Sequence, residues 1–127
     1  MGKGRYRFVR QVGGRGAFAI VSLEVEPAGE FSVDLHPAVA IDARGRQSDY
    51  GCAARTGVQY AWESVGGNRS GPPVRVTITE ITGMLADTSV MQVVYAAAMA
   101  MWEGLGRQPK NPIQIDATSS RSFQFPF

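Results

Sequence analysis

The sequence predicts an α+β fold, a two-layer sandwich with the element order β-β-β-α-β-α, a mixed sheet and two helices on one face. Three observations lead to this prediction. Four segments alternate apolar and polar residues, as half-buried strands do, and two longer segments repeat apolar residues with the period of a helix. A glycine-rich break separates the first two strand-like segments. The chain of 127 residues has no internal repeat and no interdomain linker, so residues 1–127 are expected to form a single domain.

The first two segments are predicted to pair as an antiparallel hairpin. RYRFVRQ (residues 5–11) alternates Tyr6 and Phe8 with arginines, and residues 17–26 alternate in the same way until Pro27 ends the run. Between them lies VGGRG (residues 12–16), whose glycines permit the backbone angles of a chain reversal. Alternation in FSVDLH (31–36) and VRVTITEI (74–81) predicts the third and fourth strands.

The spacing of apolar residues changes twice from the two-residue period of a strand to the period of a helix. These changes predict helices at residues 48–66 and 88–105. Ser48 or Asp49 can cap the first helix, whose apolar face is made by Ala54, Val58, Ala61 and Val65. The second helix begins at Asp87-Thr88 and is apolar on several sides, which indicates packing on more than one of them; the residues that suggest this are Val90, Met91, Val93, Val94, Tyr95, Ala97, Ala98, Met101 and Trp102.

Other positions carry smaller expectations. Trp62 and Trp102 are predicted to pack in the core or between the helices, and Cys52 is expected to be a buried, unreactive thiol on the first helix. NPIQID (111–116) can add a short edge strand. Residues 117–127 show neither the strand nor the helix period and are expected to form a mobile tail, unless their phenylalanines pack against the domain.

The positive charge is concentrated at the N-terminus. Five cations and no anion precede Glu24, although the formal net charge of the whole chain is only +2. A local basic field of this kind attracts polyanions such as nucleic acid. The alternative is a solvated hairpin face with no partner.

The sequence argues against catalysis. The one histidine, His36, stands at a strand end, and with one cysteine the chain can form no internal disulfide or cysteine-based metal cluster. No GxxxxGK[ST] loop is present, so neither nucleotide binding nor any cofactor is expected. No apolar run is long enough to span a membrane and no signal-peptide core is present, which predicts a cytoplasmic protein without a membrane partner.

Four stretches in register resemble domain IV of bacterial elongation factor G. FVRQVGGRGAF is similar to the opening of that domain, which has Arg/Lys-Gln-Ser-Gly-Gly-Arg-Gly, and LEVEP resembles its next strand. GCAARTGVQYAWESVGGNRSGPPVRVTI is similar to its first helix, loop and following strand, and ADTSVMQVVYAAAMAMWEGLG resembles its second helix. The resemblance covers residues 5–106 and lacks the factor's GTPase domain.

The resemblance implies the fold of ribosomal protein S5 domain 2, with an uncommon left-handed β-α-β crossover. It also implies a role in translation, because the tip loops of domain IV enter the decoding site of the ribosome and contact RNA. The positions that would make such contacts here are Arg7, Arg10, Gly13, Gly14, Arg15 and Gly16. Glycines would allow close approach to a phosphate-lined surface, and Arg15 would supply a planar, charged fork of donors.

The second tip loop departs from the family pattern. It corresponds to Thr82, Gly83 and Met84, and Met84 stands where the family commonly has histidine. Val12 likewise replaces the family's serine. Apolar residues Ile81, Met84 and Leu85 near a tip would suit a protein partner or a homo-oligomer contact, unless they belong to the core of a longer strand. Two functions are therefore considered: binding of ribosomal or other structured RNA, and protein interaction.

Overall fold

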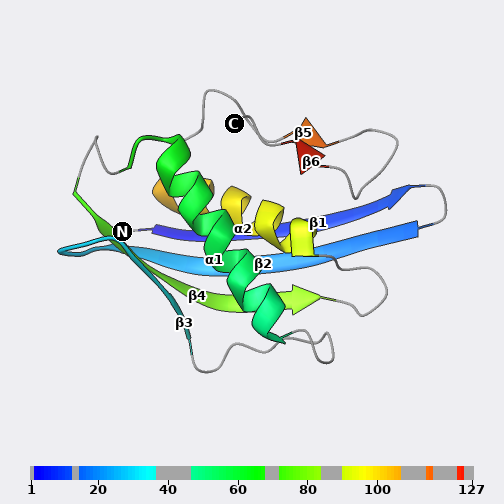
Figure 1. Cartoon of the computed structure of the whole chain (residues 1–127), viewed down its shortest axis with the longest axis horizontal. Helices are drawn as coiled ribbons and strands as arrows, with labels where there is room; N and C mark the ends of the chain where they lie inside the picture. The colour runs from blue at the N-terminus through cyan, green and yellow to red at the C-terminus, as the bar shows by residue number, and fades with distance from the viewer. Residues whose placement is uncertain are drawn as a thin grey trace.

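The computed structural model describes residues 2–12, 15–36, 47–67, 72–83, 90–106, 114–115 and 123–124. Its elements are β1 (Gly2–Val12), β2 (Arg15–Pro27), β3 (Ser32–Leu35), α1 (Gln47–Ser64), β4 (Val74–Gly83), α2 (Val90–Leu105), β5 (Gln114–Ile115) and β6 (Phe123–Gln124). Elements β1 to β4 form one sheet, and both helices cover the same face of it (Figure 1). The predicted two-layer α+β sandwich is confirmed.

The sheet is mixed, with the strand order β1-β2-β4-β3. All neighbours are antiparallel except β3 and β4, which are parallel and connected through α1. In Figure 1, α1 lies in front of the sheet, β4 runs to the right, and β3 lies below β4. The chain therefore passes from β3 through α1 to β4 as a left-handed crossover, whereas about 98% of such connections are right-handed.

The long β1–β2 hairpin follows the predicted alternation. Tyr6 pairs with Val21 and Phe8 with Ala19, and these residues face the helices. Phe8 and Tyr6 both meet the ring of Tyr95 on α2 edge-on, with ring centroids 5.4 and 5.6 Å apart. Burial of this side supplies the hydrophobic contribution that holds the hairpin to α2.

A β-bulge changes the register of β4 against β2. Ser22 pairs with Glu80, but the next residue of β2, Leu23, pairs with Ile78, so Thr79 is the extra residue. Ile78 and Ile81 therefore both face the core, and Ile81 is fully buried. Of the two interpretations of Ile81, tip residue or core residue of a longer strand, the second is confirmed.

The two helices pack closely on each other. Trp102 of α2 is buried, and its indole N–H lies within hydrogen-bonding distance of the Ala61 carbonyl oxygen (3.2 Å) and the Ser64 hydroxyl (3.1 Å) on α1. Gly57 lies at the same contact, where a Cβ would overlap the Val94 carbonyl oxygen. Trp62 is also buried and stacks on Phe31, with centroids 5.1 Å apart. Both tryptophans thus occupy the predicted packing positions.

Three smaller expectations are corrected by the structure. Cys52 is exposed, because it falls on the side of α1 that faces away from α2. Met91 is 39% exposed, unlike its neighbours on α2, because the first turn of that helix has a solvent-facing side. NPIQID contributes β5, which pairs antiparallel with β6 in a separate two-stranded sheet and is not an edge of the main sheet.

Candidate nucleic-acid interface

The face of the sheet opposite the helices carries the polar side chains of the alternating strands. On β1 these are Lys3, Arg5 and Arg7, all exposed, and the apolar Val9 is exposed on the same face. Their partners on β2 include Ser22 and Glu24, and β4 contributes Glu80 and Thr82. We call this surface the open face, because no helix among the described elements covers it. It runs from the base of the hairpin, at Lys3, to its tip, near Arg15.

The residues predicted to contact RNA lie along the tip half of this hairpin. Arg7 is exposed and pairs with Ile20 in the register. The backbones of Arg10 and Arg15 are in the strands, opposite Ala17 and Val12 respectively, so the hairpin brings these two positions to the same end. Gly16 pairs with Gln11, while Gly13 and Gly14 lie outside the described residues.

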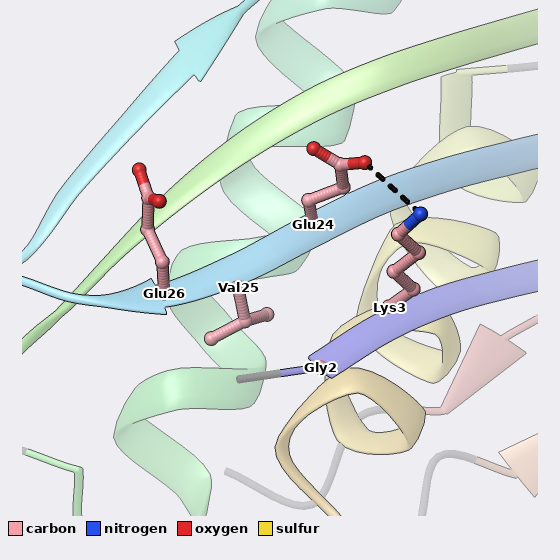
Figure 2. Close-up of a pocket in the computed structure, with 5 residues that line it drawn as sticks. All are labelled: Gly2, Lys3, Glu24, Val25 and Glu26. Carbon is pink, nitrogen blue, oxygen red and sulfur yellow. Dashed lines mark ion pairs between the residues drawn. The ribbon is translucent and has the colours of Figure 1, made fainter.

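Carboxylates neutralise the cations at the base of the open face. Lys3 and Glu24 form an ion pair of 3.6 Å, and Arg75 lies 3.9 Å from Glu26 and 3.5 Å from Asp34. Figure 2 shows Lys3 reaching from β1 to Glu24 on β2, above a pocket of about 280 Å³ that is also lined by Gly2, Val25 and Glu26. These pairs are exposed and contribute little to stability, but they leave the base close to neutral.

Glu80 forms the centre of a polar cluster midway along the open face. Its carboxylate accepts hydrogen bonds from the Ser22 hydroxyl (2.8 Å) and the Thr82 hydroxyl (3.1 Å), and Arg5 Nε lies 3.4 Å from it. The hydrogen bond from Ser22 is the largest of the effects that lower the Glu80 pKa from its ordinary value of 4.5. Thr82 and Arg5 act in the same direction, and partial burial opposes them.

Beyond this cluster the positive charge is no longer compensated. Arg7 makes no ion pair with any residue that the structure describes. From Arg15 to Leu23 the opposite strand contains no acidic residue, so the next carboxylate along β2 is Glu24 at the base. In the described part of the open face, Lys3 and Arg5, which have carboxylate partners, are therefore followed by Arg7, which has none.

The second tip loop is only partly described. Thr82 is half-buried and donates to Glu80, and Gly83 pairs through its backbone with Ala19 of β2. Met84 lies outside the described residues. Sequence reasoning missed the role of Ser22 and Thr82 as donors to Glu80, because their meeting depends on strand pairing and on the bulge. The bulge has one signal in the sequence, the three-residue spacing of Ile78 and Ile81, which breaks the two-residue period.

The groups that could take part in chemistry are dispersed. His36 is exposed just after β3, and its backbone N–H donates to the Ile78 carbonyl oxygen at 2.9 Å, as expected for a residue at a strand end. Within the described ranges, no three His, Cys, Asp or Glu side chains lie close enough together to bind a metal ion. In the same ranges, neither helix has the length and apolar character needed to cross a bilayer.

The shifted pKa of Glu80 predicts a small dependence of stability on acid pH. Because the folded-state pKa is below the unfolded-state pKa, the unfolded chain binds this proton first as the pH falls. The stabilisation is complete above pH 4.5 and is lost as the pH falls through the folded-state pKa. Replacing Glu80 by glutamine should cost less than about 1 kcal/mol at pH 7, since the group is partly exposed, and progressively less as the pH falls through the folded-state pKa. Urea unfolding of both proteins across this range measures the difference, and a constant difference would contradict it.

Comparison with known proteins identifies the fold but no family. No family model matches the chain, and no curated protein matches it. Among 52 matching chains of solved structures is the crystal structure of ttk003000868 from Thermus thermophilus, at 23% sequence identity and a TM-score of 0.60. The alignment covers 83% of this chain and 16% of that protein, so the chain spans about a sixth of its length. At this level of identity, the two proteins are shown to share the fold of this domain.

Proposed function

We propose that the chain is a non-catalytic RNA-binding domain of the elongation factor G domain IV type, which binds ribosomal or other structured RNA through the hairpin loop of residues 10–18. The observation that carries this proposal is the distribution of charged residues along the β1–β2 hairpin. Cations at the base are paired with carboxylates, whereas Arg7 and the positions of Arg10 and Arg15 face strand residues without a carboxylate. Along the β1–β2 hairpin, the cations without a carboxylate opposite them thus stand toward the loop of residues 10–18.

The architecture supports the same proposal. The left-handed β3–α1–β4 crossover is uncommon, and it is a feature that resemblance to elongation factor G domain IV implies (Figure 1). The long β1–β2 hairpin, held to α2 by Phe8 and Tyr6, gives the tip a rigid support. A rigid hairpin loses little conformational entropy when it enters a groove of folded RNA.

Recognition through the phosphate backbone fits this surface. Arginine binds phosphate through a planar fork of donors, and A-form RNA is recognised mainly by its shape and backbone. Binding of this type depends strongly on salt, because each phosphate contact releases condensed counterions. It requires no catalytic group or cofactor.

The alternative, a protein-interaction or self-associating module, depends on apolar residues of the second tip. Ile81 is one of the three residues that suggested it, and its side chain is fully buried in the core. That surface would have to be formed by Met84 and Leu85 without Ile81. We therefore prefer RNA as the partner.

The proposal is tested by titrating fluorescently labelled small-subunit ribosomal RNA with the protein at several salt concentrations. Replacing both Arg10 and Arg15 by alanine should weaken binding and reduce the slope of log affinity against log salt by about one to two. Circular dichroism serves as the control for folding. Absence of binding by the wild-type protein at low salt would overturn the proposal, whereas self-association measured by sedimentation would favour the alternative.

A further inference from the structure

We propose that Glu80 sets the inner boundary of the RNA-binding surface by holding Arg5 in an ion pair and so withholding it from phosphate. This inference rests on the proposed RNA-binding function and deepens it, since it names the residue that limits the basic tip. It concerns the row of side chains that crosses the open face at Arg5, Ser22 and Glu80, on three adjacent strands.

The register places these three residues in one line across the sheet. Arg5 pairs with Ser22 on β2, and Ser22 pairs with Glu80 on β4. Glu80 faces the open side because the bulge at Thr79 lets both Ile78 and Ile81 face the core. The bulge therefore places a carboxylate within reach of a cation two strands away.

The Glu80 carboxylate is held in a fixed orientation. Ser22 donates to Oε1 at 2.8 Å and Thr82 to Oε2 at 3.1 Å, so each carboxylate oxygen accepts a hydrogen bond from a neutral hydroxyl. Arg5 Nε contacts the same Oε1 at 3.4 Å. An anion that is already oriented binds a cation with less loss of side-chain entropy than a free one does.

The position of this pair gives it a consequence for binding. Residues two apart on a strand lie about 6.6 to 6.8 Å from each other, so Arg5 is next to Arg7 on the same face. Arg7 has no carboxylate partner among the described residues, whereas Arg5 has Glu80. Without Glu80, the basic surface would extend one residue further toward the base.

The inference is tested with Glu80→Gln, which keeps the size and a hydrogen-bonding oxygen of the side chain but removes its charge. Affinity for the labelled ribosomal RNA should rise roughly two- to fivefold, the range that corresponds to release from one exposed ion pair. The salt slope should steepen by about 0.7 to 0.9, which corresponds to one more phosphate contact.

A matched control is Glu24→Gln, which removes the same charge from the other carboxylate that pairs with a β1 cation, at 3.6 Å from Lys3. It should change affinity by less than about 1.5-fold, because Lys3 lies further from the tip. In the double variant Arg5→Gln/Glu80→Gln the gain should disappear, and Arg5→Gln alone should have little effect on affinity. Denaturation midpoints of all four variants show whether each remains folded.

The outcomes separate this inference from the proposed function. If the wild-type protein binds RNA and Glu80→Gln gives no gain, or Glu24→Gln gives an equal gain, the role of Glu80 is overturned and the proposed function stands. If neither the wild-type protein nor any variant binds, both are overturned. Binding by Glu80→Gln but not by the double variant supports the role assigned to Glu80 even where the wild-type protein binds weakly.

Discussion

Replacing Trp102 by alanine is expected to lower the free energy of unfolding by about 3 to 5 kcal/mol, one of the two largest effects that we predict. The side chain is 1% exposed and lies where α2 meets α1. Its removal would leave a cavity beside Tyr60, whose ring meets the indole edge-on at 6.2 Å. It would also remove the N–H group that contacts the Ala61 carbonyl oxygen and the Ser64 hydroxyl.

Two further variants separate packing from hydrogen bonding. Trp102→Phe keeps most of the aromatic volume but loses the indole N–H, and it should cost about 1 to 3 kcal/mol. Met91→Ala on the exposed side of the same helix should change stability by less than about 0.5 kcal/mol. Urea denaturation followed by circular dichroism gives all three values. A cost below about 1 kcal/mol for Trp102→Ala would show that the two helices do not depend on this contact.

The fold could be predicted from the sequence where one periodic signal determines the structure. Alternation of Tyr6 and Phe8 with arginines identifies both the strand and the face of β1 that packs on α2. The first helix was expected at 48–66 and spans Gln47–Ser64, followed by Gly66 with a positive φ of 68°. In such segments, local conformation and burial favour the same structure, so no tertiary information is needed.

Prediction from the sequence was less successful where contacts between strands determine the structure. The bulge at Thr79 is marked in the sequence only by the spacing of Ile78 and Ile81, which are three residues apart where alternation would place apolar residues two apart. It reverses the faces of the residues that follow, which is why Ile81 is in the core while Glu80 faces Arg5. From the sequence alone, Ile81 could be either an exposed tip residue or a core residue of a longer strand.

The candidate site, too, could be predicted only in part. The sequence reveals the basic N-terminal segment, but it does not show which cations have carboxylate partners. Lys3 and Arg5 are paired with residues 21 and 75 positions away, and the latter pairing depends on the order of strands in the sheet. Only after these pairings are known does Arg7, which has no ion-pair partner in the described ranges, distinguish the tip half of the hairpin from its base.

Reversing the charge of Arg7, by Arg7→Glu, is expected to weaken binding of small-subunit ribosomal RNA by about tenfold or more at about 0.1 M salt. The lost phosphate contact removes the release of its condensed counterion, and the new carboxylate adds repulsion. The slope of log affinity against log salt should fall by about one to two. Folding should be unaffected, since Arg7 is exposed and has no ion-pair partner in the described part of the chain.

Lys3→Glu is the matched control, because it makes the same change of charge on the same face of the same strand. Lys3 is the partner of Glu24 at the neutral base, so its reversal should weaken RNA binding by less than about threefold. Two glutamates directly opposite each other would cost about 0.2 to 1 kcal/mol of stability, which thermal unfolding can measure separately. Equal losses from Arg7→Glu and Lys3→Glu would mean that RNA responds to the total charge of the chain. A much larger loss from Arg7→Glu would instead place the contact on the tip half of the hairpin, away from the ion-paired base.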